Sequence, residues 1–300
     1  MGLEHNMENQ NFIQTLRKRA LSSFLMIGIL TLVFWMNGWV LKIFSAILVA
    51  VMTYEWVKTC KIRRQKIIYV LVPLMWLSIY LASIGRYKMA FGLILFFASV
   101  GILLSWFAWH RRFLWGGLAL IYIGLPMTSF HSIFHNNDNA LSVLIWVIAI
   151  VAGNDIGGYI FGNLLKGPKL LPEISPKKTW SGFLGGILVA LLFGSVTHSI
   201  LTCSAPEFYF YIATITLSLL AVIGDLFESF VKRKHKVKDT GNFIPGHGGV
   251  LDRLDGLLMV LPLIAWVCFN SPSMFNNFPS GYKEWKKTCQ QDASTLVSNE

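Results

Sequence analysis

The densest run of chemically capable side chains lies between Gly224 and Gly256 and reads GDLFESFVKRKHKVKDTGNFIPGHGGVLDRLDG. If its first part is helical, one face carries four polar side chains at positions i, i+3, i+4 and i+7, namely Asp225, Glu228, Ser229 and Lys232. Asp225 then lies inside an apolar run, where an ionisable side chain usually faces a protein interior or a water-filled cavity. The alternative is a carboxylate that a nearby basic residue neutralises for packing alone.

Two more carboxylates, Asp252 and Asp255, stand three residues apart where the next apolar run begins. In a helix they would share a face, and the alternative is that they only offset the helix dipole in a first turn. Mg²⁺ prefers hard oxygen ligands, with one or two carboxylates completed by water and phosphate. Together with Asp225 and the neighbouring basic residues, the pair favours a magnesium site.

The glycine-rich segment Gly246-His247-Gly248-Gly249 directly precedes this second apolar run. Flexible backbone just before a helix N-terminus allows a phosphate group to approach closely. A plain turn would look similar, so the segment supports phosphate binding only in the company of the carboxylates and lysines around it.

A second polar segment contains Ser175, Lys177, Lys178 and Thr179 and is followed by Trp180. Its ammonium and hydroxyl groups could bind phosphate oxygens. The alternative is a positively charged anchor on the cytoplasmic side, with the tryptophan at the membrane interface.

Asp155 lies within a further apolar run, next to Asn154. Such an aspartate suggests a metal or substrate ligand, and the alternative is a structural hydrogen bond to a neighbouring helix. The spacing of Gly158 and Gly162 allows another helix to pack closely against this run.

The composition explains which elements must position these residues. Of the 300 residues, 54% are hydrophobic and 14% are charged, and the mean hydropathy is +0.56. A soluble domain usually carries about 25% charged residues, so we expect an all-α integral membrane protein embedded in the lipid bilayer. The net charge of +11 comes from basic residues between apolar runs, which favours anionic lipids and phosphorylated substrates, and no nucleic acid, as partners.

A spanning helix needs about 20 mostly apolar residues, and the sequence predicts a polytopic bundle of about nine. The predicted spans are Ala20–Trp35, Trp39–Val57, Ile67–Ile84, Met89–Trp109, Phe113–Phe134, Ala140–Gly162, Gly182–Leu201, Phe208–Val231 and Gly256–Phe269. Most of the 26 Lys and Arg residues fall in cytoplasmic segments if the N-terminus is cytoplasmic, so the positive-inside rule predicts that orientation.

The chain therefore divides into four parts. A cytoplasmic N-terminal segment covers 1–19, a hydrophobic frame of helices covers 20–139, and a polar tail covers 271–300. Between them, 140–270 forms the catalytic region, with cytoplasmic loops at 163–181 and 232–255.

The four cysteines, Cys60, Cys203, Cys268 and Cys289, show no paired spacing. A zinc site or a disulfide framework usually shows regular spacings. We therefore expect neither.

The second half of the chain resembles the phosphatidate cytidylyltransferases (CDP-diacylglycerol synthases), of the bacterial type. The signature is carried by Ser229, Lys232, Arg233, Lys238, Asp239, Pro245, His247, Gly248, Gly249, Asp252, Arg253 and Asp255. The stretch from Asn154-Asp155 to Trp180 is similar to the family's other characteristic region. The first ~140 residues match only as a hydrophobic frame, which is what any bundle of spans would show.

The resemblance implies that CTP and phosphatidate react to give CDP-diacylglycerol and pyrophosphate in phospholipid biosynthesis. Catalytic roles would fall to Asp225, Asp252, Lys232, Lys238 and Asp239. Substrate-binding roles would fall to Ser175, Lys177, Lys178, Thr179, Ser229, Arg233, His247, Gly248, Gly249 and Arg253. The metal ligands would be Asp225 and Asp252 for Mg²⁺, with Asp255 or Asp155 helping to hold a second cation such as K⁺.

The implied location is the bacterial inner membrane, with the site facing the cytoplasm and a homodimer left open. One rival is a CTP-dependent polyprenol or phytol kinase on a related scaffold, which would need a base to activate the alcohol. The other is a cation-coupled transporter, in which Asp155 and Asp225 would carry protons or cations.

Overall fold

The computed structural model describes residues 38–62, 65–107, 111–241, 243, 248–281 and 283–290. The helices are α2 (Gly38–Thr59), α3 (Ile68–Ser83), α4 (Tyr87–Phe107), α5 (Arg111–Ala119), α6 (Leu125–Asn136), α7 (Ala140–Leu165), α8 (Trp180–Thr202), α9 (Phe208–Lys234) and α10 (Leu251–Asn270). Short 3₁₀ turns cover Gln65–Ile67 and Pro272–Phe275. The expected all-α class is confirmed.

The helices of the described ranges match the predicted spans. Six stretches are long and apolar enough to cross a membrane: α2, α4, α7, α8, α9 and the run Arg112–Asn136. Helix α3 is shorter, and α10 covers the ninth predicted span but begins five residues earlier than predicted. The chain is a multi-pass membrane protein. The predicted segments 1–19 and Ala20–Trp35 lie outside the described residues.

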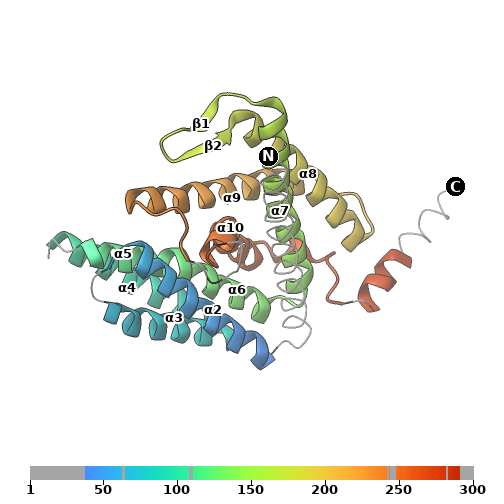
Figure 1. The fold of residues 1–300 in the computed structure, drawn as a ribbon. Coiled ribbons are helices and arrows are strands. Elements are labelled where there is room, and N and C mark those ends of the chain that lie inside the picture. The colour runs from blue at the N-terminus through green and yellow to red at the C-terminus, as the bar shows by residue number, and fades with distance from the viewer. Residues whose placement is uncertain are drawn as a thin grey trace, which may run out of the picture.

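Helix α10 occupies the centre of the bundle. It contacts α9, α6, α7 and α2, and Figure 1 shows it in the middle, with α9 above it and α2 to α6 towards the lower left. The carboxylates predicted at the start of this helix therefore lie among residues from both halves of the chain.

The run from α5 to α6 is one continuous helix with a π-helical turn at Leu120–Gly124. Pro126 follows this turn at the start of α6. Because proline has no amide hydrogen, it cannot complete the α-helical hydrogen bond to the carbonyl of Tyr122, which accounts for the local widening.

The segment expected as a loop at 163–181 contains a small hairpin. Strand β1 (Lys169–Leu171) pairs with β2 (Ser175–Thr179) in an antiparallel arrangement, with Lys169 opposite Thr179. A sheet of two strands consists only of edges, so it tolerates Pro176 within β2. The hairpin lies at the top of Figure 1, beyond α7 and α9.

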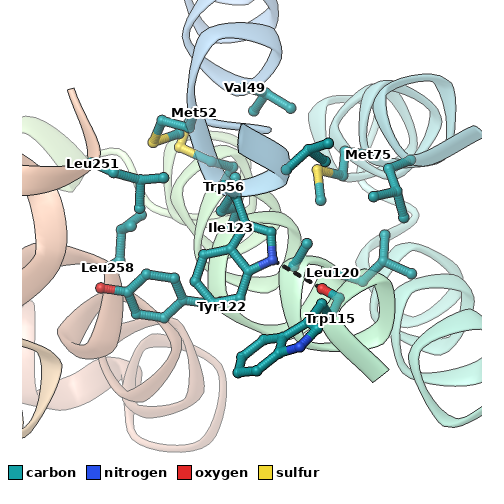
Figure 2. Packing of buried hydrophobic residues seen from close by; sticks show 14 of the residues in the cluster. Val49, Met52, Trp56, Met75, Trp115, Leu120, Tyr122, Ile123, Leu251 and Leu258 are labelled. Atoms are coloured by element: carbon teal, nitrogen blue, oxygen red, sulfur yellow. Dashed lines mark hydrogen bonds between the residues drawn. The ribbon is translucent and has the colours of Figure 1, made fainter. Parts of the chain in front are cut away.

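A buried apolar cluster joins α2 to the middle of the bundle. It includes Met52 and Trp56 from α2, Met75 from α3, Tyr122 and Leu251. Figure 2 shows these side chains together, with the Trp56 indole N–H donating to the Trp115 carbonyl at 2.9 Å. This cluster fixes the position of α2 relative to α10.

Helices α7 and α8 pack backbone to backbone through glycines. A Cβ placed on Gly157 would lie 2.5 Å from the Gly185 carbonyl oxygen, and one on Gly182 would lie 2.7 Å from that of Gly158. The glycine spacing seen in the sequence thus has the expected role in close helix packing.

Helices α9 and α10 meet in the same way. A Cβ on Gly224 would collide with the carbonyl oxygen of Asp255. This close approach places Asp225, the next residue of α9, beside the first turns of α10.

The expectation of no disulfide is wrong for one cysteine pair. Cys203, after α8, is bonded to Cys289 in the helix at 283–290, while Cys60 and Cys268 are free and buried. The two residues are 86 positions apart, and the Trp285 indole donates to the Ile200 carbonyl at 2.7 Å beside them. Only the folded position of the tail brings these cysteines together, so spacing could not reveal the pair.

We expect Gly157→Ala to lower the free energy of unfolding by about 1–3 kcal/mol, because the added methyl group meets backbone and cannot be accommodated by a rotamer change. Gly92→Ala in α4 is the matched control, since its Cβ meets nothing within 4 Å. Thermal unfolding in detergent measures both, and equal stability of the two variants would contradict the close packing.

Thiol counting tests the disulfide. Denatured but unreduced protein should take up an alkylating reagent at two cysteines, Cys60 and Cys268, and reduced protein at all four. Cys203→Ser should expose Cys289 and raise the unreduced count to three. Four reactive thiols without reductant would show that the pair is not formed.

Candidate active site

A cavity of about 810 Å³ lies where α7, α8, α9 and the hairpin meet. Its lining combines carboxylates from two helices with lysines from the hairpin and from the end of α7. The lining residues include Asp155, Tyr159, Asn163, Lys166, Lys169, Lys177, Lys178, Thr179 and Asp225. This volume falls within the range of small-molecule sites, about 300–1,000 Å³.

Asp225 is the acidic centre of this cavity. Its Oδ2 forms an ion pair with Lys178 Nζ at 2.6 Å, and its Oδ1 accepts a hydrogen bond from the Ser229 hydroxyl at 3.3 Å. The predicted i, i+4 relation on α9 is therefore a real contact. Lys178 belongs to β2, so the hairpin is tied to α9 at the cavity wall.

Two further carboxylates interact with Asp225 through space. Asp155 on α7 and Asp255 on α10 both repel Asp225 electrostatically, and they also repel one another. Lys178 and Arg253 partly offset the charge of Asp155. Three helices thus converge on a region where negative charge accumulates, which attracts cations.

A second polar cluster lies between α9 and α10. Lys232 Nζ donates to Glu228 Oε2 at 3.1 Å and to Asp252 Oδ1 at 2.8 Å. The Glu228 side chain is 2% exposed and that of Asp252 is 9% exposed. Lys232 is therefore the cation that holds together two desolvated carboxylates from different helices.

The other oxygen of Asp252 binds the loop between α9 and α10, of which residues 235–241, 243 and 248–250 are described and which we call the signature loop. Asp252 Oδ2 accepts the backbone N–H of Thr240 at 3.0 Å and that of Gly249 at 2.9 Å. Gly248, which precedes this contact, has a φ of +90° that favours glycine. Asp252 is thus hydrogen-bonded to the loop as well as to α9.

Some predicted residues have structural contacts of their own. The Thr179 hydroxyl accepts the Gly182 N–H at 3.1 Å and caps α8. Arg233 donates from Nε to the Ile174 carbonyl at 3.4 Å, which joins α9 to the hairpin turn. Ser175 lies in β2 but does not line the cavity.

The remaining predicted residues belong to the signature loop and its neighbourhood. Lys238 and Asp239 are exposed between α9 and α10. His247 and Pro245 lie outside the described residues. The structure therefore brings Asp155, Asp225, Asp255 and Lys178 together, and it places Asp252 and Lys232 in the adjoining cluster.

His235 follows α9 and packs its ring against Trp115, with ring centres 4.6 Å apart. Burial lowers the pKa of His235, and the nearby charges of Lys234 and Lys61 lower it further. This imidazole is therefore neutral at pH 7, and the described lining of the cavity includes no histidine.

The family described as the cytidylyltransferase family matches residues 17–270, which includes every element around the cavity.

The chain belongs to the cytidylyltransferase family.

Named relatives agree with this membership. The chain is 33% identical to a phosphatidate cytidylyltransferase of Brucella suis over 242 residues, covering 80% of this chain and 88% of that protein. It is 35% identical to one of Rickettsia bellii over 195 residues, covering 63% and 84%. It is 40% identical to one of Bacillus subtilis over 147 residues, covering 49% of this chain and 55% of that protein.

The carboxylates near the cavity keep some acceptor positions free. No group of three or more His, Cys, Asp or Glu side chains stands ready for a metal in the part of the chain that the structure describes. Mg²⁺ commonly binds through one or two carboxylates and takes its other oxygens from water and phosphate. A carboxylate offers about four acceptor positions, and the contacts above use two on Asp225 and three on Asp252.

Several lining residues of the cavity were not predicted from the sequence. Tyr159, Asn163, Lys166 and Lys169 all face it. Lys166 and Lys169 are two further basic residues of the same predicted cytoplasmic loop as Lys177 and Lys178, so the charge of the whole loop was the available signal.

Two buried glutamates, Glu55 of α2 and Glu228 of α9, were also not predicted as site residues. Glu55 is 0% exposed and Glu228 is 1% exposed. An ionisable residue inside a predicted span is a functional hypothesis by default, and this signal would have found Glu55 within Trp39–Val57.

Lys232→Ala should lower the free energy of unfolding by about 3–5 kcal/mol, because it leaves Glu228 and Asp252 buried without their cation. Arg233→Ala is the matched control, since this neighbouring side chain is exposed and its loss should change stability by about 0.5 kcal/mol or less. Thermal unfolding of both variants in detergent makes the comparison, and an equal loss in the two would refute the bridging role of Lys232.

Proposed function

We propose that this chain transfers the cytidylyl group of CTP to phosphatidate, forming CDP-diacylglycerol and releasing pyrophosphate. The observation that carries the proposal is the cavity beside the membrane helices, where Asp155 and Asp225 face lysines of the hairpin. Such a site can accept a divalent cation and phosphate groups together. The names of the relatives point to the same reaction.

The reaction needs little proton transfer from the protein. The attacking atom is a phosphate oxygen of phosphatidate, which is already ionised at neutral pH, so no general base is required. The main barrier is the approach of two polyanions and the release of charge on pyrophosphate, which positioned cations reduce. A cavity lined by lysines and carboxylates fits this requirement.

The lysines around the cavity would bind the phosphate groups. Lys169, Lys177 and Lys178 line it from the hairpin, and Lys166 lines it from the end of α7. Lys178 is paired with Asp225, so a phosphate that engages Lys178 would free an oxygen of Asp225. This exchange links phosphate binding to the carboxylate that we assign to the metal.

We assign Mg²⁺ to Asp225 and Asp252, and a second cation such as K⁺ to the neighbourhood of Asp255 and Asp155. Bound Mg²⁺ would polarise the α-phosphorus and offset the charge of the departing pyrophosphate. The electrostatic interaction of Asp155, Asp225 and Asp255 supports a cation in this region. Asp252 keeps fewer free acceptor positions than Asp225, so we expect it to contribute a single oxygen.

We place the site on the cytoplasmic side of a bacterial inner membrane. The distribution of Lys and Arg among the loops supports this orientation, and the named relatives are bacterial. CTP would then reach the cavity from the cytosol, while the acyl chains of phosphatidate stay in the leaflet and its headgroup enters between the helices.

Product analysis of purified protein with radiolabelled CTP, phosphatidate and Mg²⁺ tests the proposal. The expected products are a CDP-lipid and pyrophosphate. A lipid phosphate with CDP, formed from an added polyprenol, would instead show a kinase, and cation flux into liposomes without CTP turnover would show a transporter.

Asp225→Asn and Asp252→Asn should each lower kcat by at least about 100-fold, since an amide loses the charge that a metal ligand supplies. Both variants should remain folded in detergent. Asp138→Asn is the matched control, because Asp138 is exposed in the turn between α6 and α7. Near wild-type kcat of either site variant at saturating Mg²⁺ would remove that residue from the metal site.

A further inference from the structure

We propose that Glu55, on α2, is a positioning residue that holds the start of α10 and the signature loop in the geometry that the reaction requires. The inference rests on the proposed function, because it concerns how the residues of the same site are held in position. Glu55 lies in the hydrophobic frame, 170 or more residues away in sequence from every carboxylate that we assign to the metal other than Asp155.

The carboxylate of Glu55 binds the backbone at the beginning of α10. Its Oε1 accepts the N–H of Val250 at 3.0 Å, and its Oε2 accepts the N–H of Leu251 at 2.9 Å. The first amides of a helix have no partner within the helix. Glu55 therefore supplies from another helix the acceptors that a local capping side chain would supply.

Helix α2 also holds the other end of the signature loop. The Thr240 hydroxyl donates to Glu55 Oε2 at 3.5 Å, and the Thr59 hydroxyl donates to the Thr240 carbonyl at 3.3 Å. Thr59 is one helical turn after Glu55, so both contacts come from the same face of α2. Tyr54 adds an edge-to-face contact with Phe243, with ring centres 6.1 Å apart.

Two glycines of the loop leave room for this carboxylate. A Cβ on Gly241 would lie 2.5 Å from Glu55 Oε1, and one on Gly249 would lie 2.8 Å from the same oxygen. Glu55 is 0% exposed, so its oxygens have no bulk water as an alternative partner. The absence of side chains at these two positions is therefore needed for the contact, and it gives Gly249 of the signature a packing role.

The contacts of Glu55 affect the site through Asp252. Thr240 and Gly249 donate their N–H groups to Asp252 Oδ2, while Glu55 binds Thr240 and Val250, the residue after Gly249. The two carboxylates therefore bind the same two parts of the loop, at Thr240 and at Gly249–Val250. Apolar packing fixes α2 for this purpose, since Leu251 shares a buried cluster with Met52 and Trp56 (Figure 2).

The test uses Glu55→Gln and Glu55→Ala in the full-length protein, with Glu207→Gln as the matched control. Glu207 is an exposed glutamate that precedes α9, and its variant should behave as wild type. Glutamine keeps one acceptor oxygen of the same size, whereas alanine removes both. The hydrogen-exchange rate and the kcat of Glu55→Gln should therefore lie between the values of wild type and of Glu55→Ala. If the alanine variant does not fold, Glu55→Gln alone is enough for the test.

The first readout is hydrogen exchange of peptides that cover 248–255, which requires no activity. We expect exchange at least about 10-fold faster in Glu55→Gln, with α3 and α4 unchanged, because local opening becomes easier when acceptors are lost. If this segment exchanges at the wild-type rate in both Glu55 variants, the inference is overturned.

The second readout is steady-state kinetics, which shows whether the variant changes kcat or the KM for CTP. We expect kcat per folded molecule to fall on the order of 10- to 100-fold, the usual effect of removing a group that orients a ligand residue, with the KM for CTP within about 3-fold of wild type. A role in stability alone would reduce the folded fraction and leave kcat per folded molecule unchanged, and that result would also overturn the inference. A wild-type chain that makes no CDP-lipid would instead overturn the proposed function, while the exchange data would still decide whether Glu55 holds the loop.

Discussion

A lysine between two desolvated carboxylates is the interaction on which this site depends. Lys232 joins Glu228 of its own helix to Asp252 of α10, and each of the three side chains is at most 13% exposed. Taking such charges out of water costs several kcal/mol per ion unless partners of opposite sign are in place. Helices α9 and α10 are therefore joined by buried ion pairs, and the other residues of the site lie around this contact.

Close backbone packing makes this arrangement possible. Gly224 lets α9 approach the carbonyl of Asp255, and the glycines of α7 and α8 let those helices meet backbone to backbone. The close α7–α8 packing brings the hairpin back towards α9, where Lys178 reaches Asp225. The position of the cavity thus depends on glycines that have no reactive side chain. Its charged groups come from side chains of four different elements.

Local patterns along the chain predicted the helices and several contacts within them, although not the short hairpin at 169–179. Helical periodicity placed Asp225 and Ser229 on one face, and their side chains are hydrogen-bonded. It also placed Asp252 and Asp255 together, and both lie in the first turns of α10. The same reasoning could not reveal that Asp252 pairs with Lys232, that Lys178 pairs with Asp225, or that Cys203 is bonded to Cys289.

Hydrophobicity, charge distribution and helical periodicity were therefore enough to define a polytopic all-α membrane protein and its polar helix faces. The resemblance to cytidylyltransferases came from the signature residues. These properties arise within a few helical turns or from a contiguous signature. Folding alone decided which acid meets which base and that α2, through Glu55, holds the start of α10. Such contacts join residues 20 to 196 positions apart, and their partners are selected by packing geometry, for which no local pattern exists.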